Sequence, residues 1–207
     1  MDLRDPARVV TSPSISAVLR VLVEAPHAQL SMREIAAIAG ISHSAAQTVL
    51  HRLIEHGVVL TTTAGRATLC RYNHEHLAAE ALAALVTLRA KLVERLAAEI
   101  SAWPEPAVHA SLYGSGARVD GGSRSDLDIL LVRPTQLAAG EEAWDRQLSD
   151  TSARMRLRSG NPVSYVEMTR PELVAADLAG ERIVARWRAD AVHLAGEPLD
   201  RLLRASA

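Results

Sequence analysis

The sequence is poor in cysteine, has no phenylalanine and contains no long apolar run. Its single cysteine, Cys70, excludes an internal disulfide and leaves no cysteine cluster for structural zinc. A stretch of about 18 uncharged apolar residues, the length that spans a bilayer, does not occur, and the first residues lack the apolar core of a signal peptide. We therefore expect no membrane-spanning segment and a cytoplasmic location.

Excess charge of either sign is also missing. The 23 basic residues face 24 acidic residues, which gives a formal net charge of −1. This balance excludes an acidic tail and a protein that wraps a polyanion by bulk charge alone. Because 48% of the 207 residues are hydrophobic, the chain has enough apolar material for one or two domains with ordinary cores.

The most informative stretch is residues 107–132, where two apolar runs flank a polar segment rich in glycine. The first run ends at Gly114-Ser115, and the second carries Asp126 and Asp128 near its start. We predict a strand, a turn with a short helix, and a second strand. Residues two apart on a strand point to one face, about 6.6 Å apart. Two carboxylates so placed at the end of a buried strand can share divalent metal ions.

This pattern resembles the signature of minimal nucleotidyltransferases of the DNA polymerase beta-like superfamily. The residues that match are Gly114-Ser115, Ala117-Arg118 and Ser125-Asp126-Leu127-Asp128. The resemblance implies that the glycine–serine turn holds the triphosphate of an NTP and that the aspartates hold Mg²⁺ or Mn²⁺. Glycine lets the backbone approach a phosphate closely, and free N–H groups at a helix start favour an anion. The nucleotide-binding residues expected from it are Gly114, Ser115, Gly116, Arg118 and Arg124.

The third carboxylate is where the sequence departs from that signature. Many minimal members carry an acid directly after a valine on a neighbouring strand, but here Ser164 follows Val163. Glu167 is the nearest acid, although in a regular strand it lies on the opposite face from Ser164. Either the strand over 163–168 has a different register and Glu167 is the third metal ligand, which we slightly favour, or the site has only two acids. Val119 also replaces the glycine that commonly follows Ala-Arg.

Residues 13–73 have a separate pattern. The predicted elements are helices over 13–25, 31–39 and 42–56 and strands over 58–63 and 67–72. Apolar residues at helical spacing indicate the first helix, and Ser31 with Glu34 forms a capping box that begins the second. Gly40 ends the second helix, Ser42 caps the third, and Gly65 lies in the turn of a hairpin.

This order of elements resembles the winged helix-turn-helix domain of bacterial regulators. The resemblance implies that the third helix enters the major groove of DNA and that the hairpin is the wing. The residues expected to face DNA are Ser42, His43, Ser44, Gln47, Thr48, His51 and Arg52, with Arg66 at the wing tip. Through residue 75, seven arginines and no lysine face six acids, so the net charge is only +1. Because phosphate neutralisation supplies much of DNA affinity, a monomer would bind weakly and a dimer would help. A winged helix used only for protein contacts is the alternative.

The stretch between these regions, residues 74–103, is rich in alanine and leucine and has no glycine or proline. It predicts a helix about 40 Å long. Its two apolar stripes favour packing on the neighbouring domain together with pairing in a homodimer, and a wholly intramolecular linker helix is the alternative. The Pro104-Glu105-Pro106 break marks the start of a small α/β sheet with helices on its faces.

We therefore predict a two-domain protein that combines α+β and α/β folds. A winged helix-turn-helix DNA-binding domain spans 1–73, a linker or dimerisation helix spans 74–103, and a nucleotidyltransferase domain spans 104–207. In the first functional hypothesis, Asp126, Asp128 and Glu167 are catalytic metal ligands, and the enzyme transfers NMP from an NTP to a hydroxyl of protein or nucleic acid, with autoregulation through DNA. In the second, a transcriptional regulator uses an inactive transferase-like domain to sense nucleotide or metal.

Overall fold

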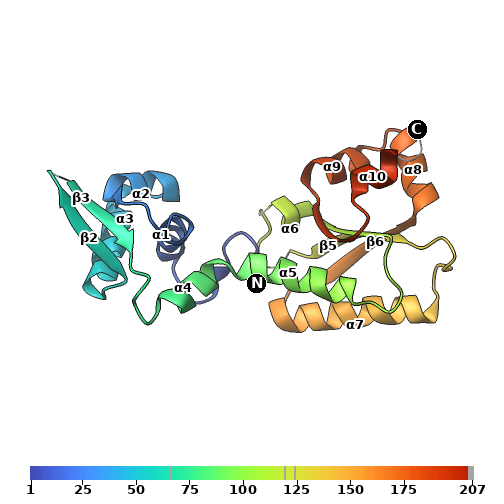
Figure 1. Ribbon diagram of the computed structural model, residues 1–207, viewed down its shortest axis with the longest axis horizontal. Coiled ribbons are helices and arrows are strands. Elements are labelled where there is room, and N and C mark those ends of the chain that lie inside the picture. The colour runs from blue at the N-terminus through green and yellow to red at the C-terminus, as the bar shows by residue number, and fades with distance from the viewer. Residues whose placement is uncertain (66, 119, 124, 205–207) are drawn as a thin grey trace. The chain divides into compact units, whose positions relative to one another are not determined.

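The computed structural model describes residues 1–65, 67–118, 120–123 and 125–204. The chain is a mixed α/β protein with two compact units (Figure 1). One unit is Asp5–Arg89 and resembles a winged helix, and the other combines Met1–Arg4 with Ala90–Ala207 around a second sheet. Among the described residues, no helix is both long and apolar enough to cross a membrane.

The N-terminal unit contains the predicted three helices and hairpin. Its elements are η1 (Pro6–Val9), α1 (Pro13–Glu24), β1 (Leu30–Ser31), α2 (Met32–Ala39), α3 (His43–Glu55), β2 (Val59–Ala64), β3 (Ala67–Tyr72) and α4 (Ala79–Val86). The capping box forms as predicted, because the Ser31 hydroxyl accepts from the Glu34 N–H and the Glu34 carboxylate accepts from the Ser31 N–H. Gly40 ends α2 in the left-handed conformation, with φ 67°. The short strand β1 was not predicted, and it pairs with β3 at the edge of an antiparallel sheet of order β1-β3-β2.

The predicted single helix over 74–103 is wrong. The structure has two helices, α4 and α5 (Leu88–Ser101), separated at Thr87. The Thr87 side-chain hydroxyl and backbone N–H both donate to the Ala83 carbonyl, which ends α4. The apolar residues are divided along the chain between two cores: Leu82 of α4 packs in the core of the N-terminal unit, and Leu96 of α5 is fully buried in the core of the C-terminal unit. Periodicity alone could not reveal this division.

The C-terminal unit is built on a four-stranded mixed sheet. Its elements after α5 are β4 (His109–Tyr113), α6 (Gly114–Arg118), β5 (Leu127–Arg133), α7 (Glu142–Ser159), β6 (Val163–Thr169), α8 (Arg170–Leu178), α9 (Arg182–Asp190), β7 (Val192–Gly196) and α10 (Leu199–Arg204). The strand order is β6-β5-β4-β7, with β5 and β6 parallel and the other two pairs antiparallel.

Helices cover both faces of this sheet, with α5 and α7 on one side and α8, α9 and α10 on the other (Figure 1). The central strand β5 therefore alternates between two cores. Ile129 and Leu131 join the core that contains Trp144 of α7, whereas Leu130 and Val132 join the core that contains α9 and α10. A buried strand with apolar residues on both faces explains the continuous apolar run in the sequence.

Candidate functional site

The turn after β4 brings Gly114 against Asp128. Tyr113, the last residue of β4, pairs with Asp128 of β5, and the chain then turns into α6 through Gly114, whose φ is 68°. A Cβ atom at position 114 would lie 2.5 Å from the Asp128 Oδ2 atom. Only glycine fits this conformation and this approach without displacing the carboxylate. The glycine–serine turn and the second aspartate therefore meet at one corner of the sheet.

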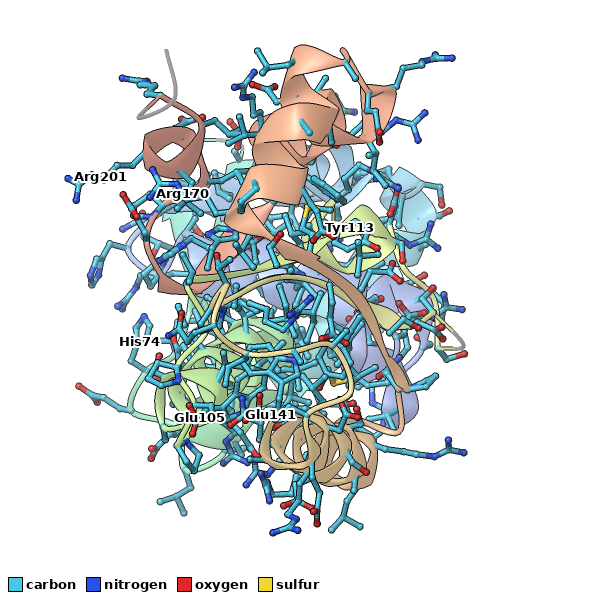
Figure 2. All side chains as sticks on the ribbon, turned by 90° about the vertical axis from the view of Figure 1, so that its right-hand side faces the viewer. His74, Glu105, Tyr113, Glu141, Arg170 and Arg201 are labelled. Atoms are coloured by element: carbon cyan, nitrogen blue, oxygen red, sulfur yellow. The ribbon has the colours of Figure 1, made fainter. Side chains whose placement is uncertain are left out.

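This corner opens into a cavity of about 280 Å³. The predicted residues that line it are Gly114, Ser115, Arg118 and Asp128. The lining residues that were not predicted are Tyr113, Ile183, Arg186, Trp187 and Asp190. Figure 2 shows Tyr113 beside the short helix α6. Four of these five residues belong to α9. The sequence predicts this helix from its apolar spacing, but it carries no signal that places the helix beside the glycine–serine turn.

The two aspartates have different surroundings. Asp126 lies just before β5, and its Oδ2 atom accepts a hydrogen bond of 3.0 Å from the Ser164 hydroxyl of β6. Burial raises the pKa of the Asp128 carboxyl, the charge of Asp126 raises it further, and Arg118 partly opposes these effects. Burial and the neighbouring negative charge thus both disfavour the ionised form of Asp128. A bound cation would supply the positive charge that favours it.

Glu167 does not join this pair. In the parallel register of β5 and β6, Ser164 lies opposite Asp128 and Glu167 lies opposite Leu131, so the two β6 side chains point to opposite faces. The Glu167 Oε2 atom accepts a hydrogen bond of 2.6 Å from the Trp144 indole on α7. The different register that would bring Glu167 to the aspartates does not occur, because β6 pairs with β5 regularly along its whole length, and Glu167 faces α7 instead.

The remaining predicted nucleotide-binding residues differ in role. Gly116 is buried, and a Cβ there would lie in ordinary van der Waals contact with Leu112, 3.4 Å from its Cδ1 atom. Arg118 is half-exposed and donates through Nε to Asp120, with Asp190 of α9 4.0 Å from its Nη1 atom. Arg124 and Val119 lie outside the described residues.

The donor set at the corner limits which metal could bind. Within the described ranges, no cluster of three or more histidine, cysteine, aspartate or glutamate side chains could hold a metal ion. Two carboxylates are nevertheless a set of hard oxygen donors that suits Mg²⁺, which commonly takes one or two protein carboxylates and completes its shell with water and substrate phosphates. The residues therefore fit a metal that arrives with a nucleotide better than a metal held by protein alone.

The second candidate site is the exposed face of α3. Every residue predicted for this helix face is exposed. Two hydroxyls are already used, because Ser42 caps the Ala45 N–H and Thr48 donates to the Ser44 carbonyl. The Ser44 hydroxyl lies 3.2 Å from the Ser42 hydroxyl. His43, Gln47 and His51 remain as candidate donors to base edges, and Arg52 as a candidate phosphate contact. Arg66 at the wing tip lies outside the described residues.

An open groove runs between this helix and the hairpin. It is lined by His43, Gln47 and His51 of α3, and also by Arg33 of α2 and the wing residues Thr61 and Thr68. Sequence reasoning missed the last three. Thr68 pairs with Thr63, and Thr61 lies two residues before Thr63 on the same strand. Since residues two apart on a strand point to one face, Thr61 and Thr68 lie on the same face of the hairpin. The groove combines one guanidinium with imidazole, amide and hydroxyl groups that can form hydrogen bonds.

Comparison with known proteins identifies the N-terminal unit. Residues 12–67 match the model of the MarR family, from the N-cap of α1 to the first residue of β3. No curated protein and no solved structure matches the chain. The family match does not extend into the C-terminal unit. Residues 12–67 of this chain are therefore a winged helix DNA-binding domain of the MarR family.

Proposed function

We propose that this protein is a transcriptional regulator whose C-terminal unit binds a complex of NTP and divalent metal as its signal, without transferring the nucleotide. The DNA-binding role follows from the MarR-family match. The observation that carries the proposal for the other unit is the hydrogen bond from Ser164 to Asp126, at the β6 position opposite Asp128. The candidate metal site thus has a hydroxyl where a transferase of the resembled type needs an acid.

Binding and transfer make different demands on this corner. Transfer needs a group that helps hold the catalytic metal and accepts the proton of the attacking hydroxyl. The Ser164 hydroxyl is neutral and already donates to Asp126, so it cannot serve as that base. Binding needs only the groups that remain: Asp126 and Asp128 toward Mg²⁺, and Ser115, the neighbouring backbone and Arg118 toward phosphates.

The apolar part of the cavity suits the nucleoside. Tyr113 and Trp187 both line it, and their rings contact each other edge to face with centroids 5.8 Å apart. Aromatic side chains next to a few convergent polar groups are typical of small-molecule sites. The cavity volume of about 280 Å³ is near the lower end for such sites, so we expect part of the nucleotide to remain in solvent.

We further propose that the protein binds DNA as a homodimer. The six acids and seven arginines of residues 5–89 leave a net charge of +1 on the N-terminal unit. Phosphate contacts supply most of non-specific DNA affinity, so one copy with this charge would bind weakly. Two copies on neighbouring half-sites double the contacts and read a longer sequence.

An active nucleotidyltransferase is the second candidate function. It is favoured by the meeting of Gly114, Ser115 and Asp128 in one cavity, with Asp126 beside them. In that case NMP would pass to a hydroxyl of protein or nucleic acid and pyrophosphate would leave. A base other than Glu167 would then be needed.

The DNA half can be tested by selecting duplexes from a random pool and measuring their affinity by fluorescence anisotropy. We expect affinity to fall with rising salt, and Arg52→Ala to lower the slope of log K against log [salt] by about one. Affinity that does not depend on salt would contradict a DNA-binding role for α3.

The ligand half uses the same duplex in the presence of Mg²⁺ and each of the four NTPs. At least one NTP should change the DNA dissociation constant, by about fivefold or more if the coupling is of the usual size. Asp128→Asn should abolish the change. Asp145→Asn is the matched control, since Asp145 is exposed on α7 and does not line the cavity. An NTP effect that survives in Asp128→Asn would refute the proposed site.

A further inference from the structure

We propose that Met1–Arg4, here called the N-terminal strap, positions the loop of the candidate nucleotide site and transmits the occupancy of that site to the DNA-binding unit. This inference rests on the proposed function. The strap precedes the DNA-binding unit in sequence but belongs to the C-terminal unit, from which the chain crosses directly into the DNA-binding unit at Asp5. A second crossing follows Arg89, so each unit is connected to the other twice.

Core packing fixes the strap in the C-terminal unit. Leu3 is 1% exposed and belongs to the same core as Leu96, Trp144 and Leu127. Burying a leucine side chain in an apolar core stabilises a fold relative to leaving it exposed. Because of this burial, Leu3 is an anchor for the chain.

The strap is hydrogen-bonded to the loop between α6 and β5. The Leu3 and Arg4 N–H groups both donate to the Gly121 carbonyl, each at 3.0 Å. The Gly121 N–H donates in turn to the Ser115 carbonyl at 3.2 Å. A Cβ at Gly121 would lie 3.1 Å from the Ser115 Oγ atom and 3.3 Å from the Leu3 Cδ1 atom. One glycine therefore contacts both the proposed phosphate-binding serine and the buried anchor of the strap.

The far end of the loop is held in a similar way. The fully buried Asn161 donates through Nδ2 to the Ser125 carbonyl at 2.9 Å and to the Met1 carbonyl at 3.1 Å. Ser125 directly precedes Asp126 in the sequence. The strap is thus connected to the loop next to Ser115 and next to Asp126, which are the two sides of the proposed metal–phosphate site.

The next residue after the strap is anchored in the DNA-binding unit. The Asp5 carboxylate accepts a hydrogen bond from the Ser16 hydroxyl of α1, and α1 packs in the core with α2 and α3. Only the peptide between Arg4 and Asp5 separates the two anchored groups. Consecutive Cα atoms are fixed at about 3.8 Å, so this connection is short. In this proposal, a ligand that shifts Gly121 acts on α1 through this short connection.

Thermodynamic linkage gives this connection a measurable consequence. If a nucleotide changes DNA affinity by a factor, DNA changes nucleotide affinity by the same factor. Slack in the strap should remove the factor and leave each binding event intact. The variant is an insertion of two glycines between Arg4 and Asp5, which keeps both sets of anchors. Its matched control is the same insertion after Ala139, in the exposed loop before α7.

The experiment measures, on the full chain, the dissociation constant of each Mg·NTP by calorimetry and of a selected DNA duplex by anisotropy, separately and together. For the strap insertion we expect the dissociation constants of Mg·NTP alone and of DNA alone to lie within about twofold of the wild-type values. The ratio of its DNA affinity with NTP to its DNA affinity without NTP should be close to one. The control insertion should keep the wild-type ratio. A strap insertion that keeps the ratio would overturn the inference while leaving the proposed function intact. Absence of NTP binding to the wild-type chain would instead remove the proposed function, and the inference with it.

Leu3 itself provides an independent test of the positioning role. Leu3→Ala should weaken Mg·NTP binding, because the loop loses the side chain that packs on Gly121, and Leu3→Met should restore it. Tryptophan fluorescence shows whether each variant is folded, since all three tryptophans are buried in the C-terminal unit. Binding by folded Leu3→Ala that equals the wild type would overturn the positioning role.

Discussion

Replacing Gly114 by alanine separates the role of the glycine turn in binding from its role in folding. The backbone at Gly114 has φ 68°, which costs an L-residue about 1–2 kcal/mol. The new Cβ would also lie 2.5 Å from the Asp128 Oδ2 atom, where ordinary contact begins at 3.4 Å. The carboxylate must therefore move by almost 1 Å. Mg²⁺ requires near-ideal geometry at about 2.0–2.1 Å, so this displacement should remove Asp128 as a ligand.

Gly180→Ala is the control for this substitution. Gly180 belongs to the same unit and has nearly the same φ, 69°, but no atom lies within 4 Å of a Cβ built there. Both variants should lose about 1–2 kcal/mol of unfolding free energy in urea. Tryptophan fluorescence follows this unit selectively, because it contains all three tryptophans.

Only Gly114→Ala should weaken binding of Mg·NTP, and we expect about tenfold or more, which corresponds to 1.4 kcal/mol. Calorimetry on the folded variants measures the difference. Equal NTP affinity for the two variants would refute the argument that Gly114 and Asp128 form one site.

Three further outcomes follow from the same geometry. Ser164→Asp adds a carboxylate beside Asp126, so Mg²⁺ should raise the melting temperature of this variant more than that of the wild type; equal shifts would count against a metal at this corner. Glu167→Gln should leave Mg·NTP affinity unchanged, since the side chain faces Trp144, and a loss of binding would restore Glu167 as a ligand candidate. Burial lowers the pKa of His109 below 6.5 in the folded chain, so as pH falls the unfolded chain protonates this imidazole before the folded chain does. The free energy of unfolding should therefore fall as pH drops below about 6.5, by at most about 1.4 kcal/mol per pH unit. Denaturation of His109→Asn across this range should show a flatter pH dependence, and an unchanged slope would assign the titration to another group.

Local chemistry made much of the fold predictable from sequence. The capping box of Ser31 and Glu34, the glycine that ends α2 and the hairpin of β2 and β3 depend on neighbours in the chain, and each forms as predicted. The helix over 74–103 failed because the apolar pattern is continuous in sequence, while its first part packs in one core and its second part in another. Only the tertiary structure decides that division.

The candidate site shows the same limit. Gly114 and Asp128 could be predicted as neighbours because a strand, a turn and a strand connect them. The contributions of α9 and of the N-terminal strap depend on which elements meet at the edge of the sheet, and no local pattern encodes this. Glu167 illustrates a different point. The two-residue period of a strand already predicts that Glu167 points to the opposite face of the sheet from Ser164, and the structure has this arrangement. The argument from the spacing between Val163 and Glu167 was weaker than the argument from this period.

The most direct test of the central claim is incubation of the full chain with each α-phosphate-labelled NTP and Mg²⁺ or Mn²⁺, in the presence of RNA, DNA and protein acceptors. The account predicts metal-dependent retention of label on a native filter, lost in Asp128→Asn, and no label that survives denaturation on any acceptor. Covalent label that disappears in Asp128→Asn would contradict it and make the protein a nucleotidyltransferase. Failure to retain any NTP would contradict it in the other direction, by removing nucleotide as the signal.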